Sequence, residues 1–523
     1  MEHIPWVLKN IPIPRGSYDK VITAIRDKIK SGIYETSNSS YRSRWFAVLK
    51  KDGKSIRLVH DLQPLNQVSI KDSAVPPTIE PYAESFGARS IYTVFDLFVG
   101  FDQCELAIQL RDLTTFQTPL GTFRLTSIPM GYTNSMQIFH GDTTFILQDK
   151  IPDVTIPFID DIPIKGPPTR FELEDGTYET MSENSNIRKF VNMHLKDVLR
   201  IAHKLKRANA TISAPKVQIG VEKALIVGHL CTYQGREPDT KRIQKILDWP
   251  LCKNVTEVRG FLGVLSQIRM FIKDYAKYAK PLTNLTKKTV DFNFRMDEIA
   301  AMQALKHLAD TCPAIRPLNY QSKNEVILAV DSSYMAVGYI ISQLGDNGKR
   351  YPNRFGSIIF NDRESRYSQA KLELYGLYRA VKDTKMFIIG VLKLIIEVDA
   401  KYIKGMLNNP DIIPNAAANR WIAYIHLFDF MLRHVPAKDH TAPDGLLRRL
   451  KAPEDPEQEA DDDESWLDSG VFALEILNWR VAPIFQSIIK RPDADPKIDQ
   501  DVEIRESFPH IPYGSSAKVK SSS

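Results

Sequence analysis

The chain has 523 residues, enough for roughly two to four domains of ordinary size. Its composition, with 43% apolar and 25% charged residues, is ordinary for a soluble globular protein that buries a sizeable core. The net charge of +6 divides unevenly, because residues 451–523 hold 8 Lys/Arg and 16 Asp/Glu, a net −8 that leaves +14 for residues 1–450. A basic body suits a nucleic-acid-binding protein, although a chance excess of surface lysines would give the same charge.

Secretion and membrane insertion are not indicated. No basic-then-apolar leader opens the chain, so we expect no secretion signal. The most apolar stretch, 386–398, has only 13 residues and contains Lys393, so it is too short to span a bilayer and is predicted to be a helix end followed by a buried strand. Four cysteines lack zinc-ligand spacing and are expected to be reduced, mostly buried thiols of an intracellular protein: Cys104, Cys231, Cys252 and Cys312.

The chain divides into four regions. Residues 1–250 alternate short β-rich runs with turn signals, residues 251–322 are helical in pattern, residues 323–450 mix strands and helices, and residues 451–523 form an acidic, largely disordered tail. Within the tail, 466–489 is an apolar island that could be a docking helix. In the helical region, Asn254 and Glu257 resemble a capping box. Seven apolar residues follow on one helical stripe: Val258, Phe261, Leu262, Leu265, Ile268, Phe271 and Ile272.

The strongest local signal in the first half is a pair of adjacent carboxylates, Asp160 and Asp161, between two expected strands at 154–159 and 162–164. Such a pair repels itself and can be buried only with a counter-charge, for which a divalent cation is suitable. A further β run at 91–95 ends at Asp96, which would supply a third carboxylate. For an isolated pair, a solvated Asp-Asp turn would be the commoner structure.

The surrounding residues resemble reverse transcriptases of the Gypsy-type long-terminal-repeat retrotransposon Pol polyprotein. Phe158-Ile159-Asp160-Asp161 resembles the aromatic-x-Asp-Asp box of that family. The other similar segments, in chain order, are the stretch from Trp45 to Asn66, Tyr92-Thr93-Val94-Phe95-Asp96-Leu97, Gly100-Phe101-Asp102-Gln103, Ile128-Pro129-Met130-Gly131-Tyr132-Thr133-Asn134-Ser135, Arg259-Gly260-Phe261-Leu262-Gly263 and Phe271-Ile272-Lys273. Two departures are Leu62-Gln63, where the family commonly has Tyr-Arg, and a charged segment, 165–185, expected to be a surface excursion.

The resemblance implies roles for individual residues. Asp96, Asp160 and Asp161 would ligate two magnesium ions, with Mn²⁺ as a possible substitute, one activating the primer 3′-hydroxyl and one holding the triphosphate. The implied nucleotide-binding residues are Lys50 and Arg57 at the phosphates, Phe101 under the sugar, and Met130 with Gly131 beside the incoming nucleotide.

Four dispersed acids mark the second half: Asp331, Glu373, Asp399 and Asp444. Asp331 and Asp399 end the expected strands 325–330 and 393–398, and Glu373 lies in an expected helix, 372–381. Asp444 sits at an expected helix start, where a carboxylate also complements the helix dipole.

These four acids resemble, in order, the acidic motifs of retrotransposon ribonuclease H. The resemblance implies a second pair of magnesium ions that cleave RNA in an RNA–DNA hybrid. His434 and His440 lie near the fourth acid and are expected to be surface residues, although one could assist product release.

The resemblance thus implies a multidomain α+β and α/β fold. A right-hand polymerase would place its fingers, its palm and the start of its thumb in 1–250. The rest of the thumb and the connection would lie in 251–322, and an RNase H-like mixed-sheet domain would follow in 323–450. The expected function is RNA-directed and DNA-directed DNA polymerase with hybrid-specific ribonuclease activity. The expected partners are an RNA template, a DNA primer, RNA–DNA hybrid and deoxynucleoside triphosphates, with no membrane, in the cytoplasm within a virus-like particle and with access to the nucleus.

Two other functions remain open at this point. One is a catalytically inactive, retroelement-derived nucleic-acid-binding protein. The other is an interaction or scaffold protein, which rests only on the acidic tail and its apolar island. No His-His-Cys-Cys integrase module occurs in the sequence.

Overall fold

The computed structural model describes residues 3–49, 55–408 and 416–435, all of which fall in one compact unit, Met1–Lys451. Lys50, His440, Asp444 and the apolar island 466–489 lie outside the described residues. Within the described ranges, no helix combines the length and the apolar character needed to cross a membrane.

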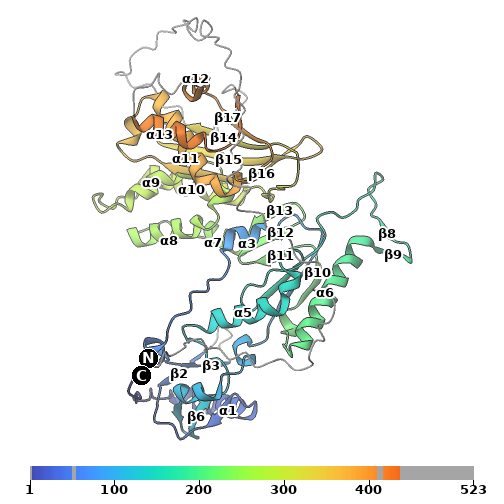
Figure 1. Ribbon diagram of the computed structural model, residues 1–523. Coiled ribbons are helices and arrows are strands. Elements are labelled where there is room, and N and C mark those ends of the chain that lie inside the picture. Colours follow the sequence, from blue (N-terminus) through green and yellow to red (C-terminus); the bar gives the residue numbers. More distant parts are fainter. Residues whose placement is uncertain (1–2, 50–54, 409–415, 436–523) are drawn as a thin grey trace, which may run out of the picture. The chain divides into compact units, whose positions relative to one another are not determined.

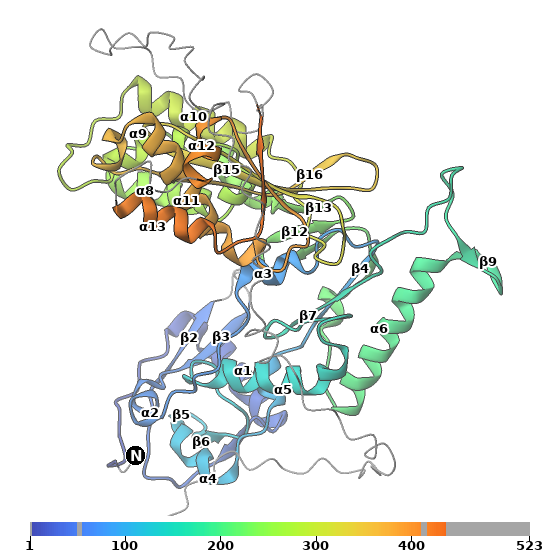
Figure 2. The same cartoon turned by 45° about the horizontal axis from the view of Figure 1, so that its top comes forward.

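The N-terminal part packs helix α1 against small β-sheets (Figures 1 and 2). Its core joins Val21 and Ile25 of α1 to Trp45, Phe116 and Phe123 of the strands. Strands β1, β6 and β5 form one antiparallel sheet, and β2 and β3 form a hairpin. The elements are η1 (Arg15–Ser17), α1 (Tyr18–Lys30), β1 (Tyr34–Thr36), β2 (Trp45–Leu49), β3 (Ile56–His60), α2 (Gln63–Val68), α3 (Ile79–Glu84), α4 (Ile108–Arg111), η3 (Asp112–Thr114), β5 (Phe116–Thr118) and β6 (Gly121–Leu125).

A second antiparallel sheet, of order β10-β4-β7, carries two long helices on one face. Phe95 and Ile162 point to that face and pack with Phe139 of α5 and with Val198 and Ile201 of α6. Alternation along β4 turns Tyr92 to the other face, toward the sheet β11-β12-β13. The elements are β4 (Tyr92–Asp96), η2 (Gly100–Gln103), α5 (Ser135–Leu147), η4 (Gln148–Lys150), β7 (Asp161–Lys165), α6 (Lys189–Arg207), η5 (Ala214–Lys216), β10 (Gln218–Val221), β11 (Ala224–Ile226), β12 (His229–Thr232) and β13 (Gly235–Pro238).

One expected strand in this region is wrong. Residues 154–159 form a loop that makes only isolated bridges, Thr155 to Ile164 and Phe158 to Asp161. Pro157 interrupts this run, because proline cannot donate a ladder hydrogen bond. The neighbouring run 162–164 is confirmed as part of β7.

The charged segment at 165–185 is confirmed as a surface excursion. It leads into the hairpin of β8 (Thr180–Met181) and β9 (Asn184–Arg188), whose residues are almost all exposed. In both views the hairpin extends away from the end of α6 (Figures 1 and 2).

Four helices follow: α7 (Thr240–Leu247), α8 (Val255–Ser266), α9 (Tyr275–Leu285) and α10 (Met296–Asp310). Asn254 caps α8 as predicted, because its side-chain oxygen accepts the N–H of Glu257 at 2.9 Å. The Glu257 carboxylate accepts the N–H of Lys253 at 2.7 Å, so the reciprocal bond reaches one residue further back than in a capping box.

The apolar stripe of this region is buried, apart from Leu262, which is half-buried. It does not form one helix, however, because α8 ends at Ser266. Ile268 and Phe271 reach the same core from the turn and from η6 (Arg269–Phe271) that follow.

The C-terminal part is a five-stranded mixed sheet of order β16-β15-β14-β17-β18. The first three strands are antiparallel, and β14, β17 and β18 are parallel. Helices α11, α12 and α13 pack on one face, while Ile340 and Phe355 on the other face join the core of the four preceding helices. The elements are β14 (Val326–Ser332), β15 (Ala336–Leu344), β16 (Arg350–Ile359), η7 (Glu364–Arg366), α11 (Gln369–Ile388), β17 (Leu394–Val398), α12 (Tyr402–Asn408), α13 (Ala416–Ile425) and β18 (Met431–His434).

The expected elements of this part are confirmed with shifted ends. Helix α11 is longer than 372–381, and the apolar stretch 386–398 is indeed the end of α11 followed by the buried strand β17. Asp331 does not end its strand, because β14 continues to Ser332. All four cysteines are free thiols, with Cys231 and Cys252 buried.

Candidate functional site

The first carboxylate cluster lies where β4 and β7 meet. The antiparallel register places Asp161, the first residue of β7, directly opposite Asp96, the last residue of β4. Asp160 lies one residue earlier, and its carbonyl accepts the N–H of Leu97 at 2.9 Å. Asp96 and the adjacent pair Asp160 and Asp161 therefore gather at one end of the sheet.

A tight turn presents Asp160 and Asp161. The N–H of Phe158 donates to the carbonyl of Asp161 at 2.8 Å, and the N–H of Asp161 donates back to Phe158 at 3.1 Å. Ile159 adopts a φ of 58° within this turn. That left-handed conformation is costly for a β-branched residue, and strain of this kind tends to occur at functional sites.

The electrostatics of the cluster suit a cation. Burial, followed by the neighbouring charges of Asp160 and Asp96, raises the pKa of Asp161 to about 6, while Lys216 opposes the rise. A site that disfavours ionisation in this way gains when a positive ion neutralises it. The charges of the three carboxylates thus suit a cation, although among the described residues only the second cluster, described below, brings three ligand atoms within 4.8 Å of one another.

Lys216 is a site residue that the sequence reasoning missed. Its Nζ atom lies 3.0 Å and 2.8 Å from the two carboxylate oxygens of Asp96, and that bond raises the pKa of Lys216. No local motif marked Lys216, because it reaches the site only when the chain returns beside β4, where the N–H of Ser213 donates to the carbonyl of Asp96 at 2.8 Å.

A cavity of about 860 Å³ opens next to this cluster. Its lining includes Asp96, Asp160 and Lys216, together with four of the five residues implied to bind nucleotide: Arg57, Phe101, Met130 and Gly131. Lys50 lies outside the described residues. Asp161 does not line this cavity.

Side chains from separate elements position the cavity wall. Arg57 is exposed on β3, and Gly131 has a φ of 94°, a conformation that favours glycine. Asn66 of α2 holds the loop around Gly131, donating to the Gly131 carbonyl at 3.0 Å and accepting the N–H of Thr133 at 2.8 Å.

Phe101 has both a packing contact and an open side. Its ring meets Phe139 edge to face at a centroid distance of 5.4 Å, and it is half-buried. The same side chain lines the cavity beside Asp96 and Asp160. Glycine at position 100 allows the Phe139 ring to lie this close to the backbone, because a Cβ there would lie 2.6 Å from the ring.

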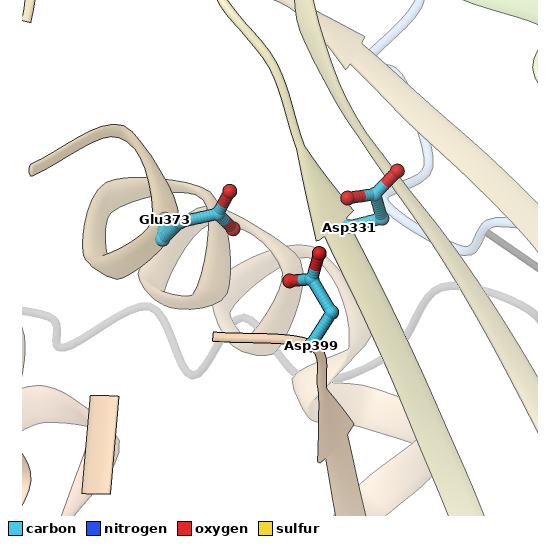
Figure 3. Close-up of side chains that lie close together, drawn as sticks. All are labelled: Asp331, Glu373 and Asp399. Atoms are coloured by element: carbon cyan, nitrogen blue, oxygen red, sulfur yellow. The ribbon is translucent and has the colours of Figure 1, made fainter. Parts of the chain in front are cut away.

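The second carboxylate cluster consists of Asp331, Glu373 and Asp399. Ligand oxygens of the three residues lie within 4.8 Å of one another. Figure 3 shows the carboxyl groups pointing toward a common space, Asp331 from β14, Glu373 from α11 and Asp399 just beyond the end of β17. Parallel pairing of β14 and β17 brings the carboxyl ends of both strands to one edge of the sheet.

The charge state of this cluster also suits a metal. Burial, followed by the charges of Asp399 and Asp331, raises the pKa of Glu373 well above its usual value. Among the described residues, the buried Oδ1 atom of Asp399 has no hydrogen-bond partner. Buried carboxylate oxygens of this kind are normally satisfied by a hydrogen bond or an ion, so the three acids could hold a divalent cation.

A close helix–strand approach brings Glu373 to the strand of Asp331. A Cβ on Gly376, one turn after Glu373, would lie 1.8 Å from the Ser332 hydroxyl. Only glycine therefore lets α11 lie this near to β14. Gly376 is a second residue that the sequence reasoning missed, although a glycine inside a helix is a signal for close packing.

Three further predicted residues belong to the second half. Asp444 and His440 lie outside the described residues. His434 is exposed, as expected, and its Nε2 atom lies 2.8 Å from the carbonyl oxygen of Asp399.

Sequence comparison finds two kinds of match. The family described as the RNase H-like domain found in reverse transcriptase matches residues 321–428. The "Retrovirus-related Pol polyprotein from transposon 297" of Drosophila melanogaster is 26% identical over 87% of this chain and 40% of its own length. The "Retrovirus-related Pol polyprotein from transposon opus" of the same species is 28% identical over 85% and 43%. The "Transposon Tf2-3 polyprotein" of Schizosaccharomyces pombe is 26% identical over 84% and 31%, so the chain spans less than half of these relatives.

Solved structures with a similar fold include foamy viral protease–reverse transcriptases. The complex with dsDNA has a TM-score of 0.69 at 17% identity, covering 83% of this chain and 86% of that one. The complex with RNA/DNA hybrid has a TM-score of 0.63 at 18% identity, covering 87% and 58%. At these identities the likeness concerns the fold.

Proposed function

We propose that this chain, which is related to the Pol polyproteins of Gypsy-type long-terminal-repeat retrotransposons, copies RNA and DNA templates into DNA and cleaves the RNA strand of RNA–DNA hybrids. The fold would then divide as a right hand, with the palm around β10-β4-β7, the fingers around β2 and β3, and the thumb beginning near α7. The five-stranded sheet with α11 to α13 would be the ribonuclease H domain, which agrees with the family match.

The observation that carries the polymerase half of the proposal is the register of β4 and β7. It sets Asp161 opposite Asp96, and Asp96 lines a cavity that Arg57 and Phe101 also line. Carboxylates would hold cations, a guanidinium would grip phosphate oxygens, and an aromatic ring would contact a sugar, so this combination suits a nucleoside triphosphate.

Each proposed residue has a physical task at the first cluster. Asp96, Asp160 and Asp161 would hold two magnesium ions, which when bound would lower the barrier to in-line phosphoryl transfer. Arg57 and Lys50 would bind the triphosphate of the incoming deoxynucleotide. Met130 and Gly131 would let the nucleotide lie close against the backbone.

The ribonuclease half rests on the triad of Asp331, Glu373 and Asp399. We propose that Asp444 joins these three as the fourth ligand of a second magnesium pair. The triad is separate in sequence and in fold from the first cluster, so the two activities should have independent sites.

Primer extension on an RNA template tests the proposal directly. Purified protein with Mg²⁺ or Mn²⁺, a primed RNA template and deoxynucleoside triphosphates should lengthen the primer, and a labelled hybrid should lose its RNA strand. EDTA should stop both reactions. Tight hybrid binding without either reaction would instead identify a catalytically inactive nucleic-acid-binding protein.

A further inference from the structure

A second cavity, of about 640 Å³, opens between α11 and α13. Its lining contains none of the carboxylates of either cluster, so neither proposed active site uses it. Volumes of this size are typical of ligand-binding pockets.

Four aromatic side chains line this cavity: Tyr367, Tyr375, Tyr378 and Trp421. Tyr375 and Trp421 lie 4.7 Å apart between ring centroids, and Tyr378 stacks on Trp421 at 6.1 Å with 23° between the planes. All four are only half-buried, so their rings are partly open to a ligand. If these rings served only to pack the helices together, we would expect them to be fully buried, because leaving apolar area exposed to water costs free energy.

Positive charge surrounds the rings. Lys382, Lys385 and Arg420 line the cavity and are exposed, and within the described part of the chain no acidic side chain is paired with them. Asp383 also lines the cavity, but its carboxylate accepts the hydroxyl of Tyr339. Glu364 is paired with Arg379 at 3.2 Å and also accepts the hydroxyl of Tyr375.

Lys382 donates to the Tyr378 hydroxyl at 3.4 Å, which holds its ammonium group beside the rings. This combination of stacked rings and cations without an acidic partner has a specific chemical complement. We propose that the cavity between α11 and α13 binds a short stretch of single-stranded nucleic acid. Unpaired bases can stack on the aromatic rings while the phosphates meet the lysine and arginine side chains. A duplex would keep its base faces covered, and an acidic peptide would satisfy the cations but leave the ring faces without a planar partner.

The site can be tested without either catalytic activity. The probe is a fluorescein-labelled oligouridylate of eight nucleotides that carries one 4-thiouridine. It is titrated into the full chain in EDTA, in the presence of saturating blunt-ended RNA–DNA hybrid, which would occupy the two sites of the proposed function. Anisotropy gives the affinity, and photocrosslinking followed by peptide mapping gives the location.

Crosslinks are expected on peptides of α11 and α13. The variant Lys382→Gln/Lys385→Gln should bind more weakly at low salt. It should also reduce the slope of log affinity against log salt by about 1.4, because each of the two lost phosphate contacts contributes about 0.7 on a single strand. The matched control Lys323→Gln/Lys349→Gln removes the same charge from exposed positions outside the cavity and should bind as the wild type does.

Trp421→Leu tests the rings and should weaken binding by at least about five-fold, the lower end for one base stacked on an aromatic side chain. Because loss of Trp421 could unfold the domain, the melting temperature of Trp421→Leu is measured alongside its affinity. If that melting temperature falls, the comparison of the lysine variant with its control decides the outcome. Crosslinks confined to other peptides, equal binding by the lysine variant and its control, or displacement by an acidic peptide would overturn the proposal. Failure of the hybrid to bind would count against the proposed function and would leave this binding unchanged.

Discussion

Lys216 places its ammonium nitrogen 3.0 Å and 2.8 Å from the two carboxylate oxygens of Asp96. Asp96 is a proposed metal ligand, so this ion pair competes with a divalent cation for the same oxygens. Lys216 is well exposed, with 64% of its side-chain surface open, and the pair is correspondingly weak.

Lys216→Met should therefore make metal binding easier. An exposed ion pair contributes about 0.2–1 kcal/mol, which corresponds to at most about a five-fold lower Mn²⁺ concentration at half-saturation. The measurement is the Mn²⁺-dependent rise in melting temperature. Lys223→Met, which removes an exposed lysine outside the cavity, serves as the control. If the Mn²⁺ concentration at half-saturation were equal in the two variants, Lys216 would not oppose metal binding.

The two carboxylate clusters should be separable by mutation. Asp160→Asn should reduce the rate of DNA synthesis by at least about 100-fold, because losing a direct metal ligand should cost more than the roughly 10–100-fold lost when a group that only hydrogen-bonds to a ligand is mutated. The rate of hybrid cleavage should stay within about two-fold of the wild-type rate. Asp399→Asn should have the opposite effect. Both activities are measured on the same preparations. Loss of both activities in either folded variant would contradict two independent sites.

Much of the framework could be predicted from the sequence. Strands before Asp96, Asp331 and Asp399 were predictable because runs of β-branched residues carry a local signal. The cluster of Asp160 and Asp161 was predictable from their adjacency. The loop at 154–159 was predicted wrongly because its β propensity is strong, whereas Pro157 denies it a regular ladder.

Other features depend on contacts that no local pattern encodes. Lys216 meets Asp96 across 120 positions of sequence. Ile340 and Phe355 are buried on the second face of the sheet only because helices from another region cover them. The apolar stripe at 258–272 predicted burial correctly but not the end of α8 at Ser266, because the residues after the turn reach the same core.

Gly376 should control the ribonuclease site through the distance between α11 and β14. Gly376→Ala forces a Cβ toward the Ser332 hydroxyl, which should cost about 1–3 kcal/mol of stability, as overpacking usually does. Hybrid cleavage should fall with it, while DNA synthesis should persist. The measurements are urea unfolding and both activity assays.

Gly263→Ala is the matched control for this change. Gly263 also lies inside a helix, but a Cβ there would meet nothing within 4 Å. That substitution should be neutral or stabilising by up to about 1 kcal/mol, because alanine favours helix. Equal stability of the two variants would contradict a tight contact at Gly376.

Asp274 gives a pH-dependent prediction away from both sites. Burial raises its pKa to about 6, and it is only 9% exposed. A raised folded-state pKa favours the folded state at low pH and loses that advantage as pH rises through about 4 to 6. Asp274→Asn should thus unfold like the wild type near pH 4 and be more stable at pH 7, by about 2–3 kcal/mol for a shift of about two units. Asparagine tolerates the φ of 58° at this position, so no strain is added.

Denaturant unfolding of both proteins at pH 4, 5, 6 and 7 measures this difference. A constant difference across the series would show that Asp274 does not titrate in this range. A variant less stable at pH 7 would show that the ionised carboxylate is well solvated or well paired.

Phe101 should select the sugar of the incoming nucleotide. Its ring lines the cavity beside Asp96 and Asp160, and there an aromatic side chain beneath the sugar would leave no room for a 2′-hydroxyl. Exclusion by overlap of this kind is worth about 1–3 kcal/mol, or roughly 5- to 150-fold in rate. Phe101→Val should raise the rate of ribonucleotide insertion relative to deoxynucleotide insertion by that factor, while the rate of deoxynucleotide insertion itself falls only modestly.

The contact between Phe101 and Phe139 sets the competing outcome. If Phe101 only packs against α5, the valine variant opens a space, lowers the melting temperature and slows insertion of both sugars alike. Single-nucleotide insertion with matched ribo- and deoxynucleotides, measured for the wild type and Phe101→Val together with their melting temperatures, distinguishes the two. A stable, active variant whose preference between the two sugars is unchanged would rule out Phe101 as the residue that excludes ribonucleotides.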